Sequence, residues 1–292
     1  MGQVCSSRRV GPDVNELPIP PPPPNHPSYD VSRRIDGNFG GAELFVVNRT
    51  IDPIGKFFMK RHNDKEYQKH KTAMRQGAAH FVRILYHEET DTPNMMFFQY
   101  FVSLKDYLKS VQGLELGYVN HLFCQLVDGL TVLHSNECQI VHRDIQPANL
   151  YVAPNAGLKI GGFHHATEFF NDSPIFFTGP MGVKEYIAPE CWAQEGTQEY
   201  RGPPTDIWAA GVVLVQLLTL AHPWRKAVVE DDDYRTYTAS REFPRPGHNM
   251  IPANAAVVLH RMFAGNPNLR ISAPRIKESL YYSTFEGYNY DE

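Results

Sequence analysis

The side chains with the most chemical potential lie in one short stretch of the 292-residue chain, residues 140–150. His142, Arg143 and Asp144 follow one another there, and Asn149 stands five residues after Asp144. Side chains of these types can accept protons, bind anions and ligate cations, which are elementary steps of acid–base and metal-assisted reactions. A lone His-Arg-Asp is weak evidence for a catalytic site. Whether residues 140–150 form one depends on the flanking residues and their spacing.

Composition limits the classes of protein to which the chain can belong. With 42% hydrophobic and 21% charged residues, it can bury one substantial core or two modest ones. The formal net charge of −4 gives no reason to expect nucleic acid as a partner, and four widely spaced cysteines indicate reduced thiols in the cytoplasm. The longest apolar stretch, residues 207–221, is shorter than a bilayer crossing. Because Thr205 and Asp206 precede it as helix-start residues, it predicts a buried core helix.

The first nine residues match the pattern for N-myristoylation, with Gly2 exposed once the initiator methionine is removed and Ser6 at the required offset. One acyl chain gives only marginal membrane binding, so a second signal is needed. Palmitoylation of Cys5, or contact of Arg8 and Arg9 with anionic lipid, would supply it. We expect a cytoplasmic protein attached peripherally to the inner leaflet; the alternative is an ordinary tail that begins with Met-Gly.

Prolines are concentrated between residues 10 and 27, with a run from Pro20 to Pro24. Such a segment is extended polyproline II and cannot build a core. We interpret it as a spacer between the anchor and the folded part; a ligand for a proline-recognition module is the alternative. The expected organisation is a disordered tail, a domain of two lobes and a short C-terminal tail, over 1–28, 29–282 (29–100 and 101–282) and 283–292.

Residues 140–150 closely resemble the catalytic loop of eukaryotic protein kinases. Further elements follow in that family's order: an apolar-periodic helix over 118–135, the Ala-Pro-Glu that ends at Glu190, Asp206 in a central helix, and Arg270 in the place of the arginine that pairs with Glu190. The resemblance is to the serine/threonine type, distantly to the calcium/calmodulin-dependent group. It implies a bilobal α+β fold with a small β-rich N-lobe and a larger α-helical C-lobe.

The resemblance also implies roles for individual residues. Asp144 would accept the proton of a substrate hydroxyl, and Asn149 would hold a magnesium ion. Lys60 matches the strand lysine that contacts the α- and β-phosphates of ATP, and Gly37 and Gly40 match the last two glycines of the phosphate-covering loop. The resemblance gives structural roles to His142, Arg143, Glu190, Asp206 and Arg270.

The family's metal-binding Asp-Phe-Gly is broken in this chain. The aligned residues are Gly162, Phe163 and His164, 18 residues beyond Asp144. Gly162 has no side chain and cannot coordinate a cation, and loss of a metal's several kcal/mol costs about a thousandfold in rate. His164 and its neighbour His165 are not expected to replace the aspartate, because neutral imidazoles suit zinc or copper better than magnesium.

Other residues depart from the family in the same direction. Gln146 and Val183 stand where serine/threonine kinases keep a lysine and a threonine that form one network with the catalytic aspartate, which indicates a lost substrate site. Phe58 shares a strand face with Lys60, so its ring would occupy the space of the adenine, unless the strand is shifted and Phe58 lies in the lobe core. Lys60 has no evident acidic partner, because Glu66 falls about a turn and a half too early on the following helix.

We therefore predict a catalytically impaired protein kinase domain that is tethered to a membrane and binds protein partners in signalling, as a scaffold or an allosteric regulator. The alternative is a weak or unconventional serine/threonine kinase that uses ATP and magnesium, since Asp144, Asn149 and Lys60 are all present. A passive nucleotide sensor is a third interpretation, which Phe58 disfavours. ATP and magnesium are needed only if the chain is an enzyme, and no other cofactor, metal or nucleic acid is expected.

Overall fold

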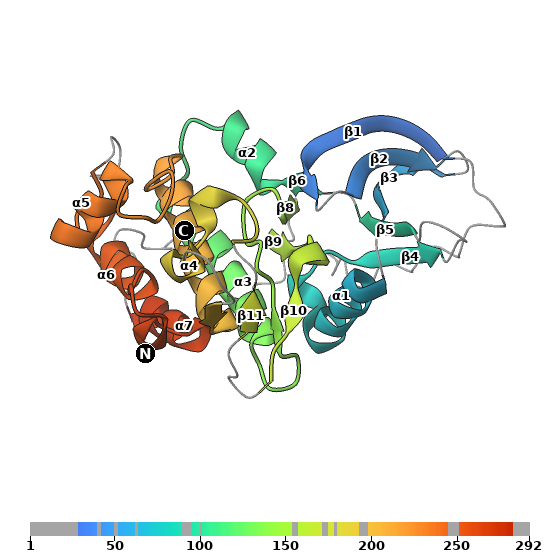
Figure 1. Ribbon diagram of the computed structural model, residues 1–292. Coiled ribbons are helices and arrows are strands. Elements are labelled where there is room, and N and C mark those ends of the chain that lie inside the picture. The colour runs from blue at the N-terminus through green and yellow to red at the C-terminus, as the bar shows by residue number, and fades with distance from the viewer. Residues whose placement is uncertain are drawn as a thin grey trace.

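The computed structural model divides the chain into two lobes (Figure 1). A small lobe carries a five-stranded sheet with helix α1 beside it, and a larger lobe carries most of the helices. This is the bilobal α+β fold that the resemblance predicts. The structure describes the following residues: 29–39, 42–49, 52–61, 64–88, 95–99, 101–153, 157–170, 175–177, 180–192, 198–244 and 251–282. The predicted tails, with Gly2 and Cys5, lie outside this range, as does Gly40.

The sheet of the small lobe is antiparallel throughout, in the order β1-β2-β3-β5-β4. Its strands are β1 (Tyr29–Phe39), β2 (Ala42–Arg49), β3 (Asp52–Arg61), β4 (Ile84–Glu88) and β5 (Met95–Gln99). Lys60 lies on the central strand β3, opposite Leu44 of β2 and Met96 of β5. Phe58 lies two residues before it on β3, and the side chains of both lie outside the described part of the chain. Gly37 lies in β1, within a register irregularity between Ile35 and Phe39.

Helix α1 (Asp64–Gly77) follows β3 after only two residues and leads into a short 3-10 turn, Ala78–His80. Its buried residues are Glu66, His70 and Ala73, whose spacing of four and three places them on one stripe. Directly after the turn, Phe81 forms a parallel bridge with Ile160 of the large lobe. The segment that follows α1 is therefore joined through its backbone to the large lobe.

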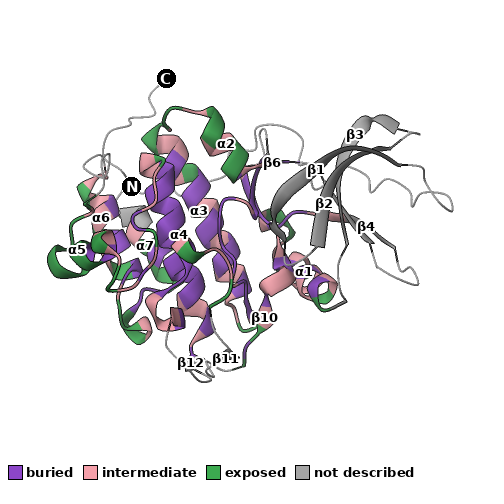
Figure 2. Cartoon of the chain, turned by 45° about the horizontal axis from the view of Figure 1, so that its top comes forward, coloured by how far each residue is buried: buried purple, intermediate pink, exposed green. Residues whose placement is uncertain are grey.

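The large lobe is organised around two long helices, α3 (Leu116–Leu133) and α4 (Gly202–Thr219); α4 is buried along most of its length, and α3 along one face (Figure 2). The leucines predicted at helical spacing in α3 are all fully buried: Leu122, Leu126, Leu130 and Leu133. The other helices are α2 (Leu104–Ser110), α5 (Asp232–Ser240), α6 (Ala253–Met262) and α7 (Ala273–Tyr282).

The core helix predicted from the apolar stretch is present as α4, but it begins earlier than expected, at Gly202. Proline is compatible with the first turn of a helix, so Pro203 and Pro204 do not delay the start. Thr205, which the sequence predicts as a helix-start residue, lies inside that turn and donates its hydroxyl to the Gly202 carbonyl (2.7 Å). Among the described residues, no helix is long and apolar enough to cross a bilayer.

Short strands surround the loop between residues 142 and 149. β6 (Val102–Ser103), β8 (Leu150–Ala153) and β9 (Gly157–Ile160) form a three-stranded sheet in that order. Two further pairs join β7 (Ile140–Val141) to β10 (Thr167–Glu168) and β11 (Ile175–Phe177) to β12 (Gln198–Tyr200). The loop is therefore held at both ends by strand pairing.

Candidate functional site

The carboxylate of Asp144 is held by two side-chain amides. Asn149 Nδ2 donates to Asp144 Oδ2 (2.7 Å) and to the Asp144 backbone carbonyl (2.8 Å), and Gln146 Nε2 donates to Asp144 Oδ1 (2.6 Å). All three side chains are buried. Gln146 thus retains a hydrogen bond to the aspartate from the position of the family's lysine, but without a positive charge. This corrects the expectation that both halves of the network around the aspartate are lost.

The backbone before Asp144 is braced from α4 by the buried carboxylate of Asp206. Its Oδ2 accepts the backbone N–H of His142 and its Oδ1 accepts that of Arg143, each at 2.8 Å. His134 Nε2, at the end of α3, donates to the same Oδ2 (3.0 Å). Arg143 has a positive φ of 65°, which costs energy for a residue with a side chain, and the two bonds to Asp206 hold it there.

Phe163, which keeps the middle place of the altered Asp-Phe-Gly motif, is fully buried among rings from three segments. Its ring centroid lies 4.5 Å from that of His70 in α1, 5.1 Å from that of His142 and 5.8 Å from that of Phe81. His142 Nε2 donates to the Gly161 carbonyl (2.8 Å). The loop, α1 and the segment before Phe163 therefore form one packed unit.

The backbone of Gly162 approaches Asn149 too closely to leave room for a side chain. Gly162 has φ 76° and ψ 44°, the left-handed conformation, and a Cβ built on it would lie 2.3 Å from Asn149 Oδ1 and 2.4 Å from Asn149 Cγ. The amide of Asn149, turned toward Asp144, thus fills the space in which an aspartate at residue 162 would begin. His164 and His165 pack edge to face, with centroids 3.8 Å apart, and no three His, Cys, Asp or Glu residues of the described ranges are grouped to hold a metal ion.

The segment from residue 180 to residue 192 covers the other side of Asp144. A Cβ built on Gly182, where φ is 93°, would lie 2.9 Å from Asp144 Oδ1. Val183 and Tyr186 line a cavity of about 30 Å³ together with Asp144, which is room for about one water molecule. A valine cannot donate a hydrogen bond to the carboxylate, so this half of the family's network is absent.

Arg143 lines the same cavity, together with Tyr200 of β12 and Cys191, and lies close enough to both to interact with them. Burial lowers the pKa of Arg143, and the nearby Tyr200 and Asp206 oppose that shift. Burial also raises the pKa of Cys191 to about 12, with a smaller contribution from the charge of Glu190. The half-buried guanidinium of Arg143 therefore lies within the large lobe, in the wall of this cavity.

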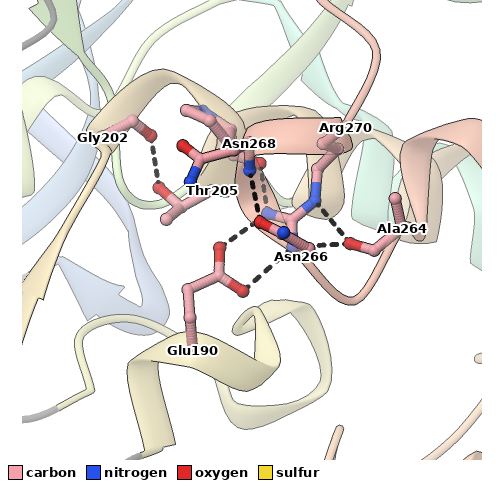
Figure 3. Close-up of polar contacts among 8 residues, drawn as sticks. Glu190, Gly202, Thr205, Ala264, Asn266, Asn268 and Arg270 are labelled. Atoms are coloured by element: carbon pink, nitrogen blue, oxygen red, sulfur yellow. Dashed lines mark hydrogen bonds and ion pairs between the residues drawn. The ribbon is translucent and has the colours of Figure 1, made fainter.

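The buried ion pair of Glu190 and Arg270 anchors the end of this segment (Figure 3). Arg270 Nη1 donates to Glu190 Oε1 (2.6 Å) and Nη2 to Oε2 (2.9 Å), a two-point contact. The remaining donors reach the carbonyls of Ala264 (3.0 and 3.2 Å) and Pro204 (2.8 Å), and the guanidinium carbon lies 5.0 Å from the Trp208 ring centroid. Each charge is thus compensated by hydrogen bonds, as burial requires.

Helix α1 brings an acidic residue to the lobe interface that the sequence analysis set aside. Glu66 is only 3% exposed and lies one turn before His70, whose Nε2 donates to the Val82 carbonyl (2.7 Å) while its ring stacks on Phe163. Lys69 Nζ donates to the Ala166 carbonyl (2.5 Å). Glu66 lies on the same buried stripe of α1 as His70 and Ala73, so the first turn of the helix faces the interior together with its middle. The distance from Glu66 to Lys60 lies outside the described contacts.

The family of the chain follows from this fold together with its similarity to known proteins. The family model for the protein kinase domain matches residues 41–282, so the chain belongs to the protein kinase superfamily, and its relatives place it with the serine/threonine type.

The chain is similar to three proteins in particular. Serine/threonine-protein kinase chk-1 of Caenorhabditis briggsae is 28% identical over 280 residues, which cover 91% of this chain and 56% of the relative. The chk-1 kinase of Caenorhabditis elegans is 27% identical over 269 residues (87% and 52%). Serine/threonine-protein kinase SAPK1 of Oryza sativa subsp. japonica is 27% identical over 274 residues (87% and 75%). The chain spans about half the length of the chk-1 relatives.

Proposed function

We propose that this protein kinase domain is impaired in phosphoryl transfer and acts by binding protein partners, as a scaffold or an allosteric regulator. The observation that carries the proposal is the contact between Gly162 and Asn149. The position of the family's metal-binding aspartate has no ligand atom, and the neighbouring amide occupies the space that a ligand's side chain needs.

The residues at this place do not fit the magnesium ion that protein kinases use. Magnesium requires oxygen donors in near-ideal octahedral geometry. Gly162 supplies no side-chain oxygen, so of the two side chains with which the family holds the metal only that of Asn149 remains, with its Oδ1 on the side of Gly162. Phosphoryl transfer depends on cations that neutralise the phosphates, so a missing site costs on the order of a thousandfold in rate.

The contacts that order the domain do not depend on a bound cation. Asp206 braces the loop, Arg270 anchors Glu190, and Phe163 packs against His70 of α1. A fold held in one arrangement by its own side chains is suited to presenting a surface to another protein. If residues 1–28 carry the acyl chain that their pattern predicts, this surface would be displayed at the inner face of a membrane.

The experiment is a phosphoryl-transfer assay of the purified full chain with magnesium and ATP, on itself and on generic serine/threonine substrates. The matched control is Asp144→Asn, which keeps the volume of the side chain but removes its capacity to accept a proton. We expect the two proteins to give the same background signal. Magnesium-dependent phosphorylation that Asp144→Asn abolishes would contradict the proposal.

A weak or unconventional serine/threonine kinase is the second candidate, because the Asp144 carboxylate is still held by Asn149 and Gln146. The relatives' names as serine/threonine kinases point the same way. This candidate requires ATP and magnesium and predicts a measurable baseline that Gly162→Asp raises. The two candidates are separated by whether any baseline depends on Asp144.

A further inference from the structure

Tyr151 is a buried tyrosine that the sequence analysis did not single out. It lies at the centre of the three-stranded sheet, in β8, opposite Ser103 of β6 and Lys159 of β9. Its neighbours Leu150 and Val152 belong to the core of the large lobe. Since side chains alternate across a strand, Tyr151 points to the other face of the sheet, yet only 7% of it is exposed.

That other face of the sheet looks toward the small-lobe side. Lys159 shares it as the cross-strand partner of Tyr151, and Lys159 Nζ donates to the carbonyl of Ala79, in the turn after α1. Burial, and then the charge of Glu66 in α1, raise the pKa of Tyr151, so the phenol lies within the field of that carboxylate. The Tyr151 side chain therefore extends from the large-lobe sheet toward the buried stripe of α1.

The ring lies directly against the backbone that precedes Gly162. A Cβ built on Gly161 would be 2.9 Å from Tyr151 Cε2 and 3.2 Å from Val82 Cγ2. The two successive glycines are thus covered by two side chains of one short segment, Gly161 by Tyr151 and Gly162 by Asn149. Residues with side chains at either glycine would collide with the groups that now fill the space.

We propose that the Tyr151 ring is a built-in occupant of the space between the lobes, and that it closes this space to the base of a nucleotide. The inference deepens the proposed function and rests on it. A nucleotide that enters beside Gly161 must displace a ring that lies against the glycine backbone, next to Val82. Bonds within the chain, from Lys69 to Ala166 and from Lys159 to Ala79, already join α1 and its turn to the large lobe without a ligand.

The test is nucleotide binding to the full chain and to Tyr151→Leu, which removes the ring but keeps an apolar side chain. The control is Tyr234→Leu, because Tyr234 is also 7% exposed but packs inside the large lobe against Trp208 and Trp224. Melting temperatures are measured with ATP, ADP or adenosine, with and without magnesium. We expect no shift for the unaltered chain or for Tyr234→Leu. For Tyr151→Leu we expect a rise of about 5 °C when the ligand exceeds its Kd about a hundredfold.

Two results would overturn the inference: a nucleotide-dependent rise in the unaltered chain, or a folded Tyr151→Leu protein that gives no rise. A third variant, Tyr151→Phe, keeps the ring and is expected to stay closed, so its binding of nucleotide would also refute the role of the ring. The measurements on the unaltered chain and on Tyr151→Phe therefore test the inference even if Tyr151→Leu does not fold. Nucleotide binding by the unaltered chain without phosphoryl transfer would reject the inference alone, whereas Asp144-dependent transfer would reject the proposed function.

Discussion

Asn149 donates its Nδ2 to Asp144 Oδ2 over 2.7 Å, and the same amide blocks the place from which a side chain on residue 162 would extend. Both effects come from the position of one side chain, since Asn149 Cγ and Cβ would also lie only 2.4 and 2.9 Å from a Cβ on residue 162. Compared with the Asp-Phe-Gly motif of the family, residue 162 lacks one carboxylate. In the structure the side chain of Asn149 packs against the backbone of Gly162 and fills the space beside it.

We predict that Gly162→Asp destabilises the domain and does not restore phosphoryl transfer. The new Cβ would lie 2.3 Å from Asn149 Oδ1 on a backbone with φ 76°, and strained or overpacked positions of this kind cost about 1 to 3 kcal/mol. The free energy of unfolding is measured in urea. Gly162→Ala is the control, because it adds the Cβ without the carboxylate and should lose a comparable amount. A stable Gly162→Asp protein with raised activity would favour the enzyme alternative.

The ion pair of Arg270 and Glu190 gives a second prediction. Arg270→Ala should lower the free energy of unfolding by about 3 to 5 kcal/mol, because it leaves the Glu190 carboxylate buried without its partner. The control is Arg275→Ala, which removes an exposed partner of Glu278 and should cost less than about 1 kcal/mol. Equal losses in urea denaturation for the two variants would show that burial does not govern the contribution of the Arg270 pair.

The large lobe could be predicted well from the sequence because its signals are redundant. The leucines of α3 recur at helical spacing, and the stretch from His142 to Asn149 carries several residues whose order is specific to one family. The same signals do not determine rotamers. The bond from Gln146 to Asp144 depends on the direction of one side chain, which no residue pattern encodes.

The lobe interface was the part that sequence reasoning missed. An isolated tyrosine in an apolar strand, such as Tyr151, is typical of a core residue. Only the structure shows that Tyr151 and Leu150 lie on opposite faces of the sheet, with Leu150 in the core of the large lobe. The sequence places Glu66 about a turn and a half too early on its helix to pair with Lys60, and it does not predict that Glu66 is buried. A charged side chain on the buried stripe of α1, as at Glu66, leaves no signal in hydrophobic periodicity.

His80, in the turn after α1, should make stability depend on pH. Burial is the main cause that lowers its pKa; the charges of Lys159 and Lys277 add to the shift and that of Asp128 opposes it. A folded-state pKa below the unfolded value of 6.5 means that the folded state favours neutral imidazole. The resulting stability is therefore complete above about pH 7 and is lost as the pH falls below 6.5 toward the folded pKa.

The measurement is the free energy of unfolding at pH 5 to 8 for the unaltered chain and for His80→Gln. Between pH 7 and pH 5 the free energy of unfolding should fall less for His80→Gln than for the unaltered chain, because the glutamine side chain does not titrate. His121→Gln serves as the control, since His121 is exposed on α3. Identical pH profiles for the unaltered chain and His80→Gln would contradict the assignment.

Membrane attachment through Gly2 is the last prediction, and it follows from the pattern of the first nine residues. Gly2→Ala removes the acyl acceptor and should shift the protein from the membrane fraction of cells to the supernatant. Cys5→Ser should reduce attachment only in part, because one myristoyl chain alone still binds bilayers with an association constant of about 10⁴ M⁻¹. Fractionation is followed by mass spectrometry of the N-terminal peptide, which reports the acyl group directly. If Gly2→Ala leaves the distribution unchanged, or if the peptide carries no acyl group, then the N-terminal residues are not an anchor and partner binding need not occur at a membrane.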